Sequence, residues 1–153
     1  MRLTAFTDYS LRVLMYLGVE PGRRATIGEI AAAFAISEHH LVKVAHFLGK
    51  AGWLRNVRGK GGGLELALPP ARINIGAVVR DTEGDAVVAE CFDGERSDRC
   101  VVAGSCKLRG PLEEALVAFY AVLDRYTLAD VVRNRGQLAQ VLFFPAAGAR
   151  KRA

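Results

Sequence analysis

The stretch TIGEIAAAFAISEHHLVKVAHFLGK, residues 26–50, decides the fold class of this chain. It predicts two helices joined by a tight turn. Thr26 caps the first helix, Glu29 completes a capping box, and Ser37 caps the second helix. Apolar residues recur at helical spacing in both: Ile27, Ile30, Ala31, Phe34, Leu41, Val44, Leu48 and Ala51. Two helices joined in this way are typical of a helix-turn-helix, whose second helix enters the major groove of DNA.

The following stretch, RNVRGKGGGLELAL over residues 55–68, predicts a β-hairpin. Its glycine-rich turn carries Arg58 and Lys60, and its return strand places three leucines on one face. Glycine permits positive φ and close approach to phosphates, while Arg and Lys supply counter-charge. A basic hairpin after a helix-turn-helix is typical of a wing, and a purely structural hairpin is the alternative. A P-loop is excluded, because Leu54 and Gly61 occupy positions that require Gly and Ser or Thr.

Further helices are predicted on both sides of this unit. Residues 4–18, 74–83 and 127–134 have the apolar spacing of helices. A longer helix is expected to begin at Gly110-Pro111, since proline is tolerated in a first turn, and to extend to Tyr126. Its apolar side chains follow a heptad-like spacing and exceed what one small winged domain can cover. A helix that forms a homodimer is favoured, and packing within its own chain is the alternative.

The formal net charge of +5 is concentrated in the N-terminal part. Residues 1–80 hold eleven Lys or Arg against five Asp or Glu, whereas residues 81–153 hold ten against eleven. A basic N-terminal half favours contact with a polyanion, and a solvated basic surface is the alternative. No apolar run is long enough for a transmembrane helix, and the first residues lack the pattern of a signal peptide. A cytoplasmic protein without membrane contact is expected.

All three cysteines, Cys91, Cys100 and Cys106, lie in a polar loop predicted over residues 84–108. An odd number of cysteines in a cytosolic protein argues against a disulfide framework. The spacing lacks the Cys-x2-Cys pair of zinc ribbons. A cubane iron–sulfur cluster needs four ligands, usually thiolates, so three cysteines leave one position for another residue. A cluster is favoured, and zinc, a metal-free thiol switch and inert cysteines remain alternatives.

Several stretches together resemble one known family. They are MRLTAFTDYSLRVLMYL (1–17), SEHHLVKVAHFLGKAGWL (37–54), VRGKGGGLELA (57–67), INIGAVVRDTEG (73–84) and YTLADVV (126–132). The chain resembles, from Met1 to about Leu142, the NsrR family of nitric-oxide-sensing iron–sulfur regulators, which are related to IscR and RirA. The resemblance implies a winged-helix homodimer with a 4Fe–4S cluster. It also implies a repressor of nitric-oxide detoxification genes that leaves DNA when nitric oxide reacts with the cluster.

The resemblance also assigns ligands. Cys91, Cys100 and Cys106 match the cluster-ligating cysteines of the family, and Asp8 matches an acidic residue that completes the cluster from the partner subunit. From the residues alone, Asp8 is a first-turn carboxylate that suits the helix dipole and pairs with Arg12 four residues on. With the resemblance, this pair would couple the first helix to the sensor loop.

One cysteine spacing departs from the family pattern. Eight residues separate Cys91 from Cys100, whereas the family generally has a shorter spacing, and the five residues between Cys100 and Cys106 fit. RirA-like iron regulators share a longer first spacing, so iron or iron–sulfur status is the leading alternative signal. Residue 107 is Lys, where the IscR branch has a ligating histidine.

The expected DNA contacts lie on two segments. A homodimer would present two helices, 37–50, to successive major grooves of double-stranded DNA at a near-palindromic operator. Residues expected to face bases or phosphates are Ser37, Glu38, His39, His40 and Lys43, with Arg58 and Lys60 on the wing. A helix cap for Ser37 and mere solvation for His39 and His40 are the alternatives.

The predicted fold is mainly α with a small β wing. A winged helix-turn-helix domain is expected at 1–70, a dimerisation and iron–sulfur sensor region at 71–142, and a disordered basic tail at 143–153. An iron–sulfur electron carrier is a rival function, although it leaves the basic wing without a role. An enzyme is not expected, because no nucleophile–base pair or cofactor loop is evident in the sequence.

Overall fold

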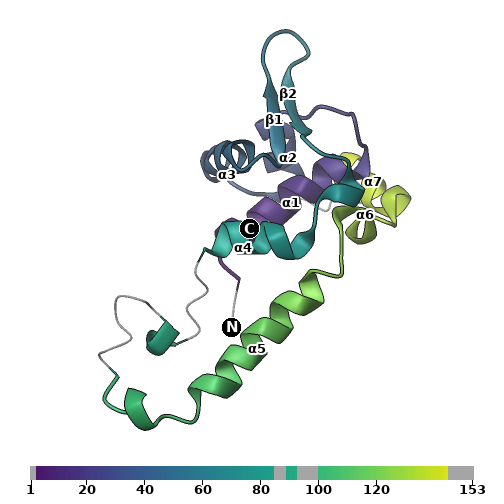
Figure 1. The fold of residues 1–153 in the computed structure, drawn as a ribbon. Helices are drawn as coiled ribbons and strands as arrows, with labels where there is room; N and C mark the ends of the chain where they lie inside the picture. The colour runs from purple at the N-terminus through teal and green to yellow at the C-terminus, as the bar shows by residue number, and fades with distance from the viewer. Residues whose placement is uncertain (1–2, 85–88, 93–99, 145–153) are drawn as a thin grey trace.

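A computed structural model of the chain describes residues 3–84, 89–92 and 100–144. It confirms the predicted fold class, since the described residues form helices and one two-stranded antiparallel sheet (Figure 1). The helices are α1 (Ala5–Val19), α2 (Ile27–Phe34), α3 (Glu38–Lys50), α4 (Ile75–Glu83), α5 (Arg109–Leu123), α6 (Leu128–Val131) and α7 (Arg135–Phe143). The strands are β1 (Leu54–Val57) and β2 (Gly63–Leu66), and short 3-10 turns are η1 (Pro70–Arg72), η2 (Glu90–Phe92) and η4 (Ala103–Ser105).

The helix starts follow local side-chain chemistry. The predicted capping box at α2 is confirmed: the Thr26 hydroxyl accepts from the Glu29 amide, and the Glu29 carboxylate accepts from the Thr26 amide at 2.7 Å. Ala35 then takes a left-handed conformation at φ +53° and turns the chain toward α3. Ser37 occupies the N-cap position of α3, but its side chain makes no capping hydrogen bond, so the predicted cap bond is wrong.

Helix α1 forms the centre of the core. Leu14 and Leu48, from α1 and α3, are fully buried, and the rings of Phe6 and Phe47 meet edge to face between the same helices at 5.2 Å. The other side of α1 packs against α4, α6 and α7. Helix α7 was not expected from the sequence, and it is anchored where the rings of Tyr16 and Phe143 meet at 5.0 Å.

The wing is a two-stranded hairpin, as predicted. Leu54 pairs with Leu66 and Val57 pairs with Gly63 in the antiparallel register. Leu64 is buried, whereas the two leucines after it are only partly buried. The turn requires glycine at position 62, because a β carbon there would lie 2.3 Å from the carbonyl oxygen of Val57.

Helix α5 leaves the body of the molecule. Figure 1 shows it running away from α4 and α6 toward the η2 and η4 turns, at the end opposite the wing. No residue of this fully described helix is buried. Near the end of the helix, Phe119, Tyr120 and Leu123 are partly buried against the core. Arg80 of α4 adds a polar contact, since its guanidinium binds Asp124 at 2.8 Å and lies 4.6 Å from the ring centroid of Tyr120. The predicted long helix is confirmed, although it ends at Leu123 and not at Tyr126.

The proposed C-terminal tail lies almost wholly outside the described residues. Residues 145–153 are not described, and Phe143 is the last residue of α7. Within the described ranges, no helix has the length and apolar character needed to cross a bilayer.

Candidate nucleic-acid interface and cysteine loop

Helix α3 carries the predicted recognition residues on its exposed side. Ser37, Glu38, His39, His40 and Lys43 are all exposed. The opposite side of the helix is buried against α1 and α2. A polar exposed face backed by an apolar buried face is the arrangement that a recognition helix needs.

Two of these side chains have partners on neighbouring helices. A carboxylate oxygen of Glu38 lies 3.5 Å from where a β carbon on Gly28 would sit, so this side chain leans over the first turn of α2. A helix N-terminus favours a carboxylate at that place. The His40 ring lies 6.1 Å from the ring of Tyr9, which places α3 beside the residue that follows Asp8 in α1.

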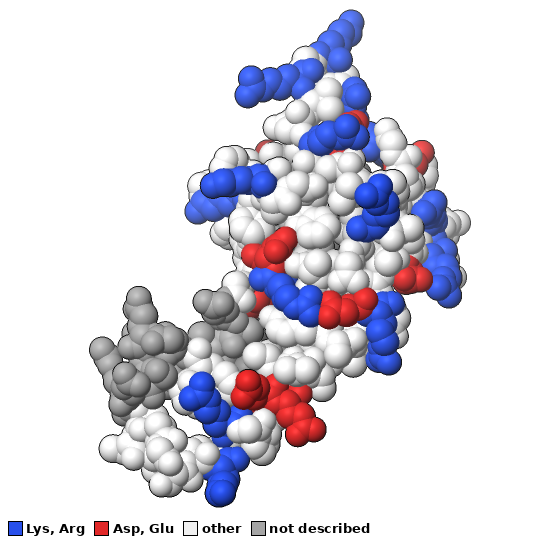
Figure 2. All heavy atoms as spheres, viewed as in Figure 1, with Lys and Arg blue, Asp and Glu red and all other residues white. Residues whose placement is uncertain are grey.

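The tip of the wing is basic and exposed. Figure 2 shows Lys and Arg side chains gathered at the projecting end of the molecule that Figure 1 identifies as the wing. Arg58 and Lys60 are both exposed there. Gly59 and Gly61 adopt φ values of +97° and +76°, which L side chains rarely tolerate. The glycines allow the tight turn, while Arg58 before them and Lys60 between them are exposed to solvent.

A groove of about 800 Å³ separates α3 from the wing. Its polar lining includes His46 and Lys50 from α3, and Arg55, Asn56 and Glu65 from the wing. None of these was among the predicted contact residues. His46 and Lys50 continue the exposed stripe of α3 at helical spacing from Lys43, so periodicity could have identified them. Arg55 and Glu65 became evident only when the strand register was known.

The cysteine loop is only partly described. Cys91 lies in η2, Cys106 directly follows η4, and all three thiols, including that of Cys100, are free and partly buried. Among residues 3–84, 89–92 and 100–144, no group of three Cys, His, Asp or Glu side chains lies close enough to hold a metal ion. The described single chain therefore does not assemble a metal site.

Asp8 lies in the first turn of α1, away from these cysteines in sequence. Its carboxylate accepts from Nε of Arg12 at 3.1 Å and pairs with Nη2 at 2.9 Å. The intrahelical pair considered from the sequence is therefore present. Both side chains remain more than 40% exposed, so the carboxylate lies at the surface.

The start of α1 is also tied to the segment that enters the cysteine loop. The Glu83 carboxylate, at the end of α4, accepts from the Thr4 amide at 2.8 Å and from its hydroxyl at 3.1 Å. Trp53, just before the wing, donates to the Asp81 carboxylate at 2.8 Å. The last turn of α4 thus contacts both α1 and the base of the wing.

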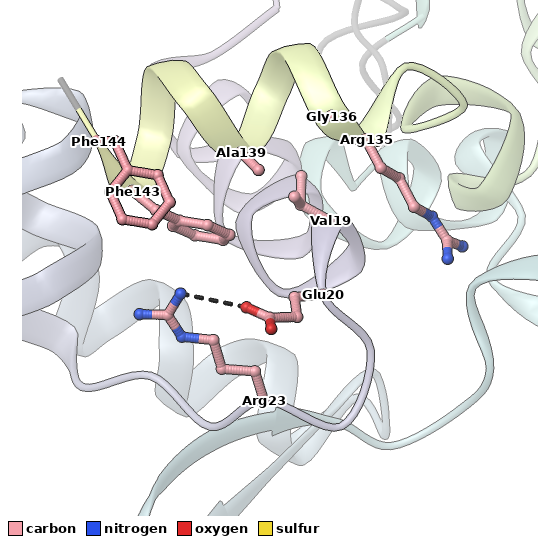
Figure 3. Close-up of a pocket in the computed structure, with 8 residues that line it drawn as sticks. All are labelled: Val19, Glu20, Arg23, Arg135, Gly136, Ala139, Phe143 and Phe144. Carbon is pink, nitrogen blue, oxygen red and sulfur yellow. Dashed lines mark hydrogen bonds and ion pairs between the residues drawn. The ribbon is translucent and has the colours of Figure 1, made fainter. Parts of the chain in front are cut away.

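A second hollow, of about 550 Å³, lies between the end of α1 and α7 (Figure 3). Arg23 is one of the residues that line this hollow. The Arg23 guanidinium pairs with the Glu20 carboxylate at 3.2 Å and lies 4.2 Å from the ring centroid of Phe143. These contacts join the turn after α1 to the end of α7.

Comparisons with known proteins agree with this geometry. A family model described as Rrf2, iron-dependent transcriptional regulator, matches residues 3–134. The HTH-type transcriptional regulator NsrR of Bacillus subtilis (strain 168) is 48% identical over 93% of this chain and 97% of its own length. The protein of the same name from Geobacillus kaustophilus is 49% identical over the same shares.

Solved structures share the fold. The T. potens IscR structure superposes with a TM-score of 0.72, at 24% identity, over 90% of each chain. The oxidized form of Staphylococcus aureus CymR gives a TM-score of 0.67, at 24% identity, over 86% of this chain and 96% of its own. At this identity the likeness concerns the fold alone.

Proposed function

This chain belongs to the Rrf2 family of transcriptional regulators, and we propose that it is an NsrR-type repressor: a DNA-binding homodimer with a 4Fe–4S cluster that responds to nitric oxide. The resemblance to NsrR seen in the sequence is confirmed by relatives of that name at 42–49% identity. The observation that carries the proposal is the pairing of an exposed polar α3 face with a basic wing, in a chain that matches these relatives almost end to end.

DNA would contact both walls of the groove between α3 and the wing. The exposed residues of α3 would face base edges in the major groove. Lys50 and Arg55 in the groove, with Arg58 and Lys60 at the tip, would neutralise phosphates. Two copies with α3 helices about one helical turn apart would require a near-palindromic operator.

Helix α5 supports the homodimer. Val117 and Val122 are 63% and 45% exposed, and Leu108, just before the helix, is 61% exposed. A described helix with so much exposed apolar surface and no buried residue is typical of an interface. A second copy of the chain, packed along α5, would cover these side chains.

The donor set fits an iron–sulfur cluster by its chemistry. Cys91, Cys100 and Cys106 would supply three thiolates, the usual ligands of such clusters, and Asp8 of the second subunit would supply a carboxylate. The bound cluster would supply the reactivity toward nitric oxide.

Asp8 would connect the sensor to DNA binding through this chain's own packing. Helix α1 carries Asp8, and the contact of Phe6 with Phe47 joins α1 to α3. Arg12 orients the Asp8 carboxylate through two contacts. Loss of the Asp8 interaction would release the first turn of α1 and change the position of α3. Asp8 would in this way couple the state of the cluster site to that of the DNA-binding site.

The test is anaerobic DNA binding before and after nitric oxide. We expect a brown dimer that binds a duplex selected from random sequence, and whose affinity falls when nitric oxide is added. In the Asp8→Ala variant, the link between cluster status and DNA affinity should weaken, so that nitric oxide changes the affinity less than in the wild type. Unchanged nitric-oxide sensitivity in Asp8→Ala would contradict the role of Asp8, and a colourless protein that takes up no iron would contradict the cluster and favour zinc or thiol sensing.

The spacing of the cysteines favours one second candidate. Eight residues between Cys91 and Cys100 resemble the longer loop of RirA-like regulators, so iron status is the competing signal. An iron chelator that releases the protein from DNA when nitric oxide does not would support this reading. Reversible one-electron cycling without salt-sensitive DNA binding would instead support an electron carrier. As a regulator of chromosomal genes, the protein would act in the cytoplasm.

A further inference from the structure

An ion-paired carboxylate lies at the base of the wing. Glu65, in β2, accepts from Nε of Arg24 at 2.9 Å and lies 3.4 Å from Nε of Arg55, its cross-strand partner in β1. The Glu65 side chain is only 19% exposed, whereas the two arginines are 44% and 65% exposed. The hydrogen bond from Arg24 lowers the pKa of Glu65, so the carboxylate stays charged at neutral pH.

Arg24 also contacts the turn of the wing directly. Its Nη1 donates to the carbonyl oxygen of Gly61 at 3.3 Å. One guanidinium therefore spans from the second strand to the glycine-rich turn, next to Lys60. Because Arg24 lies 41 residues before Glu65, this contact joins the α1–α2 connection to the wing.

The backbone makes a parallel connection. The Leu64 amide donates to Ala25 at 2.8 Å, and the Ala25 amide donates back to Leu64 at 3.1 Å. A β carbon on Gly63 would lie 2.8 Å from the Ala25 carbonyl oxygen, which shows how closely the two segments approach. Ala25 is followed at once by the capping box of α2, so the segment that holds the wing is itself fixed.

A carboxylate in this place opposes DNA binding by its charge alone. Glu65 lines the groove between α3 and the wing, where phosphates would lie. Its removal should strengthen binding if charge is its only effect. If Glu65 instead holds the wing in position, its removal should weaken DNA binding. The direction of the change in affinity therefore distinguishes a charge effect from a positioning effect.

We propose that Glu65, held by Arg24 and Arg55, is a positioning residue that fixes the wing at the angle from which Arg58 and Lys60 reach DNA. This inference rests on DNA binding through the wing, as proposed above. Without this clamp of Glu65, Arg24 and Arg55, the wing would sample other angles. DNA binding would then have to order the wing, and the entropy lost in doing so would lower the affinity.

The test compares variants of the anaerobic holoprotein by anisotropy on a duplex of about 30 base pairs selected with the wild type, long enough for two half-sites. Glu65→Gln should weaken binding about three- to fivefold, the range of a partly exposed ion-pair network. The dependence of affinity on salt should keep its slope, because no phosphate contact is lost. Arg58→Ala should instead lower that slope by about one.

Three further variants separate position from charge. Arg24→Lys keeps the charge but cannot make both contacts, so its binding should weaken. Arg24→Ala with Glu65→Gln leaves net charge unchanged, yet should bind as weakly as either single variant. Glu20→Gln is the matched control, since Glu20 also pairs with an arginine, Arg23, in the same connection but does not contact the wing; its binding should stay at the wild-type level.

Hydrogen exchange at the Leu64 amide gives a readout without DNA. It should accelerate in Glu65→Gln and Arg24→Lys while exchange in α1 is unchanged, which also shows that both variants fold. If the wild-type protein binds DNA and Glu65→Gln binds equally well or more tightly, the clamp proposal is overturned while the proposed function stands. A wild-type protein without salt-sensitive DNA binding would overturn the proposed function, whereas faster Leu64 exchange would still support the clamp.

Discussion

The body around α1 and the segment formed by α5 with the cysteines differ in how much of their structure one chain supplies. In the body, Leu14, Leu41 and Leu48 are 0–1% exposed, and the helix ends at α2 and α6 are closed by capping boxes. In α5, which is wholly described, no residue is buried and no side chain caps the first turn. The comparison teaches that the helix-turn-helix and the wing pack around a core supplied by one chain, whereas α5 leaves apolar side chains such as Val117 and Val122 exposed.

The largest predicted contrast concerns stability. Leu14→Ala should lower the free energy of unfolding by about 2–5 kcal/mol, because it opens a cavity in a fully buried site. Val117→Ala on α5 should change it by less than about 0.5 kcal/mol under conditions where the chain is monomeric. Urea unfolding at low protein concentration measures both. Equal losses would show that α5 belongs to the folded core of a single chain.

The next contrast compares two glycines. Gly62→Ala places a β carbon 2.3 Å from the Val57 carbonyl oxygen, so the wing turn must shift, at about 1–3 kcal/mol of local strain. DNA affinity should fall, and exchange at the Leu64 amide should rise. Gly104→Ala, in η4, meets no atom within 4 Å and should leave DNA affinity unchanged. A strong effect of Gly104→Ala would show that the cysteine segment constrains the wing in the protein as purified.

A smaller effect is expected at the α2 cap. Thr26→Ala removes the hydroxyl that accepts from the Glu29 amide, and should lower the free energy of unfolding by about 0.5–2 kcal/mol. Thr26→Ser keeps the hydroxyl and serves as the control. Thermal unfolding followed by circular dichroism measures the difference, and identical melting curves for the Ala and Ser variants would contradict the cap.

The smallest effect is a pH dependence to which two carboxylates of the body contribute. The Thr26 backbone amide lowers the pKa of Glu29, and the Thr127 backbone amide lowers the pKa of Asp130. Both carboxylates bind protons less readily in the folded state than in the unfolded state. They therefore stabilise the folded state at pH values above their unfolded pKa values, and this stabilisation is lost as the pH falls through their lowered folded-state pKa values. Stability should decline below about pH 4.5, and Glu29→Gln should flatten the decline. An unchanged slope in Glu29→Gln would count against this contribution.

Much of the body follows from local sequence signals. The α2 capping box, the apolar spacing of α3 and the glycine-rich turn near Arg58 are all encoded within a few residues and were predicted correctly, with one exception. Ala51 was expected on the buried face of α3, but it follows the last residue of the helix and is exposed. Helix α7 was missed because its stretch RGQLAQVLF has neither a capping signal nor a clear apolar face, and it depends on the contact of Phe143 with Tyr16.

Long-range contacts lay beyond local signals. Arg24 with Glu65, and Trp53 with Asp81, are joined across 41 and 28 residues, so spacing could not identify them. Ser37 shows the opposite error: it has the residue type and position of a cap but makes no cap bond. The cysteine site stays a prediction, because its ligands Cys91, Cys100, Cys106 and the partner's Asp8 were assigned by the resemblance and no local signal places them together.

The most direct test of whether Asp8 of one copy completes the cysteine site of the other is native mass spectrometry of a mixed dimer. One chain carries Asp8→Ala, the other carries Cys106→Ser, and different affinity tags allow the mixed form to be isolated without oxygen. If Asp8 completes the site of its partner, one site in the mixed dimer stays intact, and we predict one cluster per dimer with the wild-type absorption. A mixed dimer with no more cluster than the Asp8→Ala homodimer, or a chain that stays monomeric, would contradict a sensor completed by a second copy.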